Sequence, residues 1–132
     1  MLKITNEIVD AIFAQGKLEL PNEACGYLAG KDDAVSKHYE MTNVDQSNEH
    51  FTLDPKEQFK VLKETRKEGI DILAIYHTHP ETPARPSQED IKLAFDPNVI
   101  YVIASLADDT KSIKGFRIVN GEVTNEEIKI ND

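Results

Sequence analysis

The chain has 132 residues, the length of a single domain, and we expect residues 1–132 to form one folded unit. A hydrophobic content of 39% and a charged content of 30% exclude disordered and fibrous proteins. The formal charge of −9 at pH 7 argues against nucleic acid and anionic membranes as partners, because both are negatively charged.

Signals for export or membrane insertion are missing from the sequence. No apolar run approaches the roughly 20 residues that cross a bilayer, and the first residues lack the apolar core of a signal peptide. Cys25 is the single cysteine and forms no internal disulfide, which is consistent with a reducing compartment. We therefore expect a cytoplasmic protein; its oligomeric state does not follow from the sequence.

Capping residues and hydrophobic periodicity divide the first half of the chain into helices and strands. The expected elements are a helix capped by Thr5 whose end is bracketed by Gly16 and Pro21, a strand over residues 23–30, a turn at 31–33 and a returning strand over 34–43. Residues 44–53 predict a polar loop that ends in a short extended piece. Asp54 and Pro55 begin a second helix, in which Phe59 and Leu62 are expected to face inward and which Gly69 ends.

The second half predicts a mixed sheet with one short helix. The expected elements are a strand over residues 70–76, a helix from Ser87 to about Phe95, a strand over 99–104 buried on both faces, and strands over 111–119 and 122–130 joined by Asn120-Gly121. Helices that alternate with a mixed sheet indicate an α/β fold, with the sheet sandwiched between helices.

Two histidines follow the apolar strand over residues 70–76 directly. Strand side chains alternate with a period of two, so His77 and His79 project to the same side. Ser87 and Asp90 are three residues apart, on one face of the first turn of the next helix. Two imidazoles, one carboxylate and an open fourth position describe a catalytic zinc site, although other divalent ions remain possible from the residues alone.

Such a site predicts hydrolysis of an amide bond. Zinc lowers the pKa of a bound water from 15.7 to about 7, and a general base must move the water proton to the leaving amine. Glu23 is our candidate for that base, and Ser87 for stabilising the oxyanion beside the metal.

The arrangement of Glu23, His77-x-His79, Ser87 and Asp90 resembles the signature of the JAMM (MPN+, Mov34/PAD-like) metalloproteases. The resemblance covers essentially the whole chain and implies an α/β/α sandwich with a mixed, curved, cytidine-deaminase-like sheet. It also implies one zinc ion per chain on His77, His79 and Asp90, with Glu23 as general base and Ser87 as oxyanion stabiliser.

The compact chain and the stretch His79-Pro80 followed by Pro83-Ala84-Arg85-Pro86-Ser87 are similar to small prokaryotic members of this family. Those members act on ubiquitin-like sulfur-carrier proteins. The expected function is therefore hydrolysis of a peptide or isopeptide bond after the Gly-Gly end of such a carrier. The identity of the carrier and the residue released do not follow from the sequence.

Three other functions fit the sequence less well. An inactive scaffold of the same fold usually loses metal ligands, which this chain keeps, and a RadC-like role with DNA disagrees with the acidic charge. A zinc nucleobase deaminase requires a Pro-Cys-x-x-Cys ligand pair, which a chain with one cysteine lacks.

Several residues have simpler explanations than catalysis. Ser87 and Asp90 also match a capping box, and Cys25 is typical of a small buried apolar residue. His38 and His50 are expected at the surface, and Arg85 either meets the substrate tail or is solvated. By position alone, residues 46–53 are candidates for lining a substrate groove.

Overall fold

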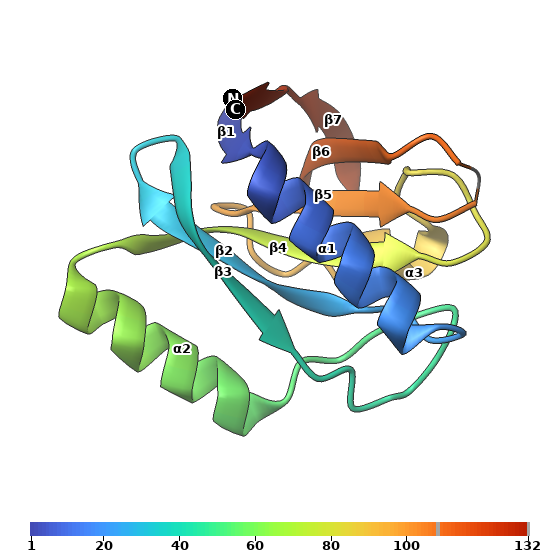
Figure 1. Cartoon of the computed structure of the whole chain (residues 1–132), viewed down its shortest axis with the longest axis horizontal. Helices are drawn as coiled ribbons and strands as arrows, with labels where there is room; N and C mark the ends of the chain where they lie inside the picture. Colours follow the sequence, from blue (N-terminus) through green and yellow to red (C-terminus); the bar gives the residue numbers. More distant parts are fainter. Residues whose placement is uncertain (108, 132) are drawn as a thin grey trace.

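The computed structural model describes residues 1–107 and 109–131 (Figure 1). The elements in chain order are β1 (Leu2–Thr5), α1 (Asn6–Glu19), β2 (Cys25–Lys31), β3 (Ala34–Met41), α2 (Pro55–Glu68), β4 (Asp71–His79), α3 (Gln88–Lys92), β5 (Ile100–Ser105), β6 (Ser112–Val119), β7 (Glu122–Glu126) and β8 (Ile128–Asn131). In the part of the chain described, no helix is both long enough and apolar enough to cross a membrane.

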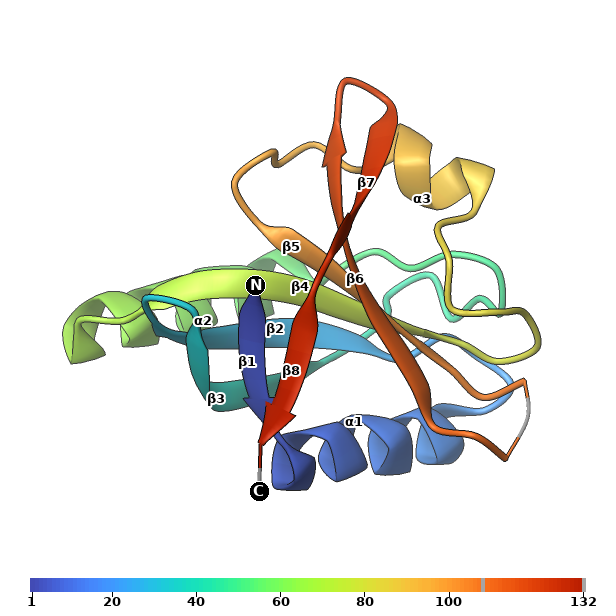
Figure 2. The same ribbon diagram turned by 90° about the horizontal axis from the view of Figure 1, so that it is seen from above.

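All the strands named above belong to one mixed sheet in the order β7-β6-β5-β4-β2-β3-β1-β8. β4 pairs with β5 in parallel, as β1 does with β3 and β8, and the remaining pairs are antiparallel. β7 and β8 lie at opposite ends of this order, yet Glu127 alone separates them in the chain. The sheet therefore curves until its two ends approach each other (Figure 2).

Helices cover both faces of the sheet (Figure 2). On one face, Val9, Ile12 and Phe13 of α1 pack in a cluster with Tyr76 and Val102. Side chains alternate along a strand, so the neighbours of these strand residues point to the opposite face. There Val61 of α2 packs with Tyr27, and Ile91 of α3 packs against the cluster of Tyr101 and Ile103. The predicted α/β/α sandwich with a mixed, curved sheet is confirmed.

The predicted helix caps are present. Thr5 Oγ1 accepts a hydrogen bond from the Ile8 amide, and Asp54 caps α2 ahead of Pro55. Gly69 ends α2 at φ 71°, a backbone conformation that favours glycine. Gly16 and Pro21 bracket the end of α1 at Glu19, as expected, and a Cβ atom on Gly16 would come within 2.9 Å of Thr78 Cγ2. This glycine therefore lets α1 approach β4 closely.

The expected inward face of α2 is wrong. Phe59 is 70% exposed and Leu62 is 44% exposed, whereas Val61 and Thr65 are buried. Only a narrow stripe of the helix contacts the sheet, so two large apolar side chains remain on its outer side.

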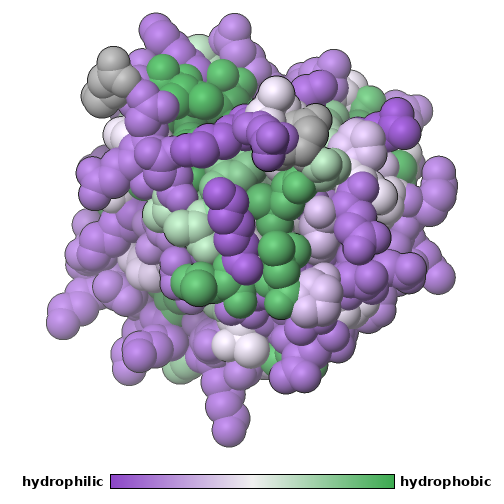
Figure 3. Space-filling model, turned by 45° about the vertical axis from the view of Figure 1, so that its right-hand side comes forward, coloured by the Kyte–Doolittle hydropathy of each residue, from purple (hydrophilic) through white to green (hydrophobic). Residues whose placement is uncertain are grey.

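Figure 3 shows that hydrophobic side chains also gather at the surface on another face of the molecule, surrounded by hydrophilic ones.

The ends of the chain also differ from expectation. β1 was not predicted, because its four residues are too short to show a period and its partner β8 lies at the other end of the chain. The strand expected over residues 122–130 divides at Glu127 into β7 and β8. The Glu127 carbonyl accepts a hydrogen bond from the Leu2 amide, which places β8 beside β1.

Candidate active site

His77 and His79 are buried at the end of β4, on the face covered by α2 and α3. The strand extends to His79, three residues beyond the expected end, because Thr78 and His79 still pair with Ala104 and Ser105 of β5. Their exposed fractions are 2% and 3%. A regular strand thus aims both imidazoles at the same side, as the period of two predicts.

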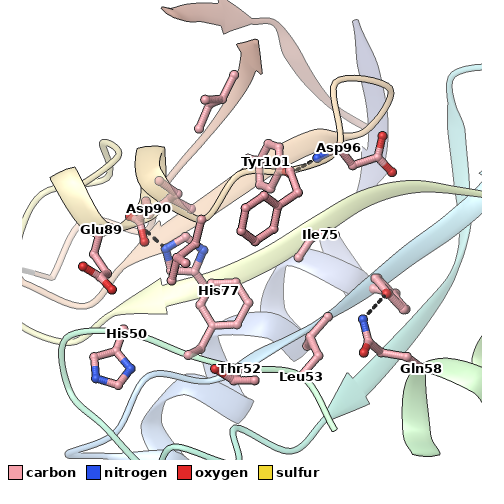
Figure 4. Close-up of a pocket in the computed structure, with 16 residues that line it drawn as sticks. His50, Thr52, Leu53, Gln58, Ile75, His77, Glu89, Asp90, Asp96 and Tyr101 are labelled. Atoms are coloured by element: carbon pink, nitrogen blue, oxygen red, sulfur yellow. Dashed lines mark hydrogen bonds and ion pairs between the residues drawn. The ribbon is translucent and has the colours of Figure 1, made fainter. Parts of the chain in front are cut away.

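Both imidazoles meet the carboxylate of Asp90. His77 Nε2 lies 3.2 Å from His79 Nε2, and Asp90 Oδ2 lies 3.2 Å from the first and 3.0 Å from the second. Figure 4 shows the Asp90 carboxylate directed at His77. Three atoms with lone pairs therefore surround one point.

Neighbouring groups fix the two rings. His79 Nδ1 lies 2.9 Å from the Pro83 carbonyl oxygen, so the nitrogen bears a hydrogen and leaves the Nε2 lone pair free. The Phe51 ring stacks on His77 with centroids 4.6 Å apart. The proline-containing loop after β4 thus orients one ligand, and the loop before α2 orients the other.

Asp90 has two roles: it belongs to the capping box of α3, and its carboxylate faces the two histidines. Ser87 Oγ accepts a hydrogen bond from the Asp90 amide at 3.0 Å, and Asp90 Oδ2 accepts one from the Ser87 amide at 2.9 Å. The same Oδ2 atom faces both histidines. The capping box therefore does not compete with the site; it holds the carboxylate in place.

Glu23 lies just before β2, 2% exposed, beside the same two histidines. One ligand atom from each of Glu23, His77 and His79 falls within 4.8 Å of the others. Its backbone is held by Ser47, whose carbonyl accepts from the Glu23 amide, and by Asn43, whose Nδ2 donates to the Glu23 carbonyl. Among the described residues, Glu23 Oε1 is a buried atom without a hydrogen-bond partner, which suits a polar occupant of the site.

Burial and charge shift the acidities in this cluster. Burial raises the pKa of Glu23 to about 8, and nearby His79 opposes that shift. Burial lowers the pKa of His77 against the opposing effect of Asp90. Burial would raise the pKa of Asp90, but its hydrogen bonds with His77 and His79 outweigh this and hold that pKa well below the ordinary value. A neutral His77 and an ionised Asp90 are the forms that bind metals.

The donor set fits a zinc ion. Ligands at 2.0–2.1 Å around a tetrahedral zinc are separated by about 3.3 Å. The separations of 3.0 to 3.2 Å among His77, His79 and Asp90 are close to that value. Two nitrogens and one oxygen leave a fourth position open, as catalytic zinc sites do.

The other residues considered in the sequence lie outside the cluster of His77, His79 and Asp90. Cys25 is fully buried, and burial raises the pKa of its thiol to about 12, so it is the small apolar residue expected. His38 was expected at the surface; instead it is half-buried in an interior strand, 2.8 Å from the Tyr76 hydroxyl. His50 lies in a loop beside Asp45, as expected, and Arg85 is exposed.

Two supporting residues escaped the sequence analysis. Asn43 forms hydrogen bonds with the Glu23 carbonyl and with His50 and Thr52 of the loop between β3 and α2. Thr78 is fully buried, accepts from the Ala24 amide through Oγ1 and donates to the Ala24 carbonyl through its own amide. Neither stands out in the sequence, because Asn43 reaches Glu23 across 20 residues and Thr78 reaches Ala24 across 54.

The chain is similar in sequence to known proteins. The family described as prokaryotic homologs of the JAB domain (Prok-JAB) matches residues 5–119. The CysO-cysteine peptidase of Mycobacterium tuberculosis is 37% identical over 98% of this chain and 91% of its own length. The probable TtuB-protein conjugate cleaving protease of Thermus thermophilus is 37% identical over 79% of this chain and 67% of its own.

Solved structures support the same fold. A protein from Desulfitobacterium hafniense is 43% identical, with a TM-score of 0.93 over 100% of this chain and 94% of its own. A structure described as a JAMM metalloprotease-like zinc site in the proteasome and signalosome superposes with a TM-score of 0.61 at 19% identity, covering 100% of this chain and 99% of its own. At that identity the likeness concerns the fold alone.

Proposed function

The chain belongs to the family of prokaryotic homologs of the JAB domain, and on that premise we propose that it is a zinc-dependent metallopeptidase. Its reaction is hydrolysis of a peptide or isopeptide bond that follows the Gly-Gly end of a ubiquitin-like sulfur-carrier protein. The observation that carries this proposal is the meeting of His77, His79 and Asp90 within 3.2 Å of one another beside a buried Glu23.

His77, His79 and Asp90 would hold the zinc ion, one per chain. When bound, zinc supplies a Lewis acid that lowers the pKa of water at its open position to about 7. Glu23 accepts the proton released there and returns it to the leaving amine, because its carboxylate lies beside both histidines. Ser87 Oγ already accepts from the Asp90 amide, so its hydroxyl hydrogen is available to donate to the developing oxyanion.

The names of two relatives support the substrate class. The proteins similar to this chain are named for cleaving CysO-cysteine and TtuB-protein conjugates. Two terminal glycines suit the site, because a segment without Cβ atoms can approach buried ligands closely. A cytoplasmic location agrees with such a substrate and stays a prediction from the sequence.

A direct test uses a carrier from the same cell. The purified, zinc-loaded protein is incubated with that carrier extended by one residue after Gly-Gly, and mass spectrometry follows the carrier mass. We expect loss of the added residue, and no loss with the His77→Ala variant. If no carrier of the cell is cleaved although zinc is bound, this substrate class is wrong; if zinc does not bind, the proposed zinc-dependent mechanism is wrong.

A further inference from the structure

An apolar cavity of about 420 Å³ opens beside the candidate metal ligands. His77 and Asp90 line one end of it, and Ile75 and Tyr101 form part of its floor on the sheet (Figure 4). Leu53, from the loop before α2, and Leu93, directly after α3, also line it. Two glycines have no side chains to fill such a volume, so the proposed tail alone leaves this cavity unexplained.

We propose that the cavity binds the apolar side chain of the residue that precedes the two glycines of the substrate. The inference rests on the proposed function and adds to it the specificity for the carrier tail. Three features of the cavity support this inference. They are its position relative to Glu23, the polarity of its wall, and its spacing from His77.

The cavity lies on the acyl side of the bond to be cleaved. On β4, Ile75, His77 and His79 share one face, and Ile75 pairs with Tyr27 while His77 pairs with Cys25. Ile75 and Tyr27 line the cavity, whereas His79 and Glu23 do not.

Glu23 therefore flanks the ligands at the end opposite to the cavity. Because Glu23 protonates the leaving amine, that amine lies at its end of the site. The acyl segment, which contains the two glycines and the residue before them, extends toward the cavity.

The wall of the cavity favours an apolar occupant. Tyr27 Oη accepts a hydrogen bond from Gln58 Nε2 at 3.0 Å, and Tyr101 Oη accepts one from the Asp96 amide at 3.1 Å. Both hydroxyls are thus engaged by α2 and by the loop after α3. The exposed carboxylates of Glu89 and Asp96 also border the cavity and would repel an acidic side chain.

The spacing selects which residue enters. An extended peptide advances about 3.3 Å per residue, so a chain whose last glycine lies at His77 carries the residue two positions earlier about 7 Å away. Ile75 is two residues before His77 on β4, so the same spacing reaches the cavity floor. The occupant is therefore the first residue before Gly-Gly.

The test measures binding apart from cleavage. Labelled peptides that end in Leu-Gly-Gly, Ala-Gly-Gly or Asp-Gly-Gly are titrated with the protein in zinc-containing buffer, and fluorescence anisotropy gives each Kd. We expect the leucine peptide to bind about tenfold or more tightly than the other two, from burial of its side chain. Leu93→Asp should abolish that preference, and the matched control Leu18→Asp, at a site 87% exposed on α1, should retain it.

Leu93 is 41% exposed, so the substitution is compatible with folding, and Phe95→Asp at a site 82% exposed provides a second charged variant at the cavity. Equal Kd values for the three peptides, or an unchanged leucine preference in both variants, would overturn the inference. The same peptides extended by cysteine report cleavage. If they bind with the leucine preference but none is cleaved, the cavity assignment holds and the proposed function is wrong. If they are cleaved without any preference for leucine, the proposed function holds and the cavity assignment is wrong.

Discussion

Glu23 occupies the environment that a general base of a hydrolase needs. Its carboxyl group is buried, and burial raises its pKa to about 8, so it binds a proton far more readily than a solvated glutamate. His79 opposes that shift, and a bound cation would oppose it further. The carboxyl group can therefore accept and release a proton near neutral pH.

Replacing this carboxylate separates catalysis from metal binding. For Glu23→Gln we expect zinc to stay bound, because His77, His79 and Asp90 remain, while kcat falls by roughly 10² to 10⁴. Metal analysis and carrier cleavage give the two readouts. Unchanged turnover would remove Glu23 from the proposed mechanism.

A second prediction concerns His38. Tyr76 donates its hydroxyl hydrogen to Gln15, so the bond between His38 Nε2 and the Tyr76 oxygen requires the imidazole to donate. Burial lowers the pKa of His38 below its ordinary 6.5, and Glu40 partly opposes this. The unfolded chain therefore takes up the proton more readily, and the stability present above pH 6.5 is lost as the pH falls through the lower pKa of the folded state.

We expect His38→Gln to weaken this dependence, because it removes the titrating group. The free energy of unfolding in urea, measured at steps between about pH 7 and pH 5, gives the slope for each protein. The difference between the two slopes isolates His38 from the other histidines. Identical slopes would show that His38 does not contribute.

Among the elements, the loop between β3 and α2 depends on one buried amide. Asn43 Nδ2 donates to the carbonyls of Glu23 and His50 at 3.1 Å each, and its Oδ1 accepts from the Asp45 and Thr52 amides. One side chain thus joins the loop to the backbone of the proposed base.

Asn43→Asp keeps the shape but removes both donated hydrogen bonds and places a negative charge against two carbonyls. We expect a stability loss of about 1–3 kcal/mol, faster hydrogen exchange at the Glu23 amide, and lower kcat. Asn48→Asp, an exposed site in the same loop, is the matched control and should change none of these. Similar exchange in both variants would contradict the role given to Asn43.

Local signals determined which elements were predictable. The caps of α1 and α2, the apolar run of β5 and the Asn120-Gly121 turn are encoded within a few neighbouring residues. β1 and β8 are four residues each and depend on pairing across the whole chain, which no local pattern shows. The outer position of Phe59 follows from how α2 meets the sheet, which its own sequence does not specify.

The residues of the site likewise differ in how far the sequence predicts them. The spacing of His77, His79 and Asp90 on a strand and a helix turn was sufficient to predict their meeting. Glu23 carries no local signal, and the family resemblance singled it out. Asn43 and the apolar cavity arise only when the loops fold over the sheet, so no pattern in the sequence indicated them.

At the scale of the whole molecule, curvature of the sheet brings distant segments together. β8 pairs with β1 in parallel, and the terminal amine of Met1 forms an ion pair with Glu126, so the first and last strands lie side by side (Figure 2). Within this frame the proposed ligands come from β4 and from the cap of α3. A zinc ion would join the short helix to the sheet.

Titration of the metal-free protein with zinc, with carrier cleavage as the readout, tests the central claim most directly. Our account predicts that cleavage is absent without metal, rises in proportion to added zinc and reaches its plateau at one equivalent per chain. His77→Ala and Asp90→Ala should stay inactive throughout. Full cleavage by the metal-free protein, or by either variant, would contradict the account.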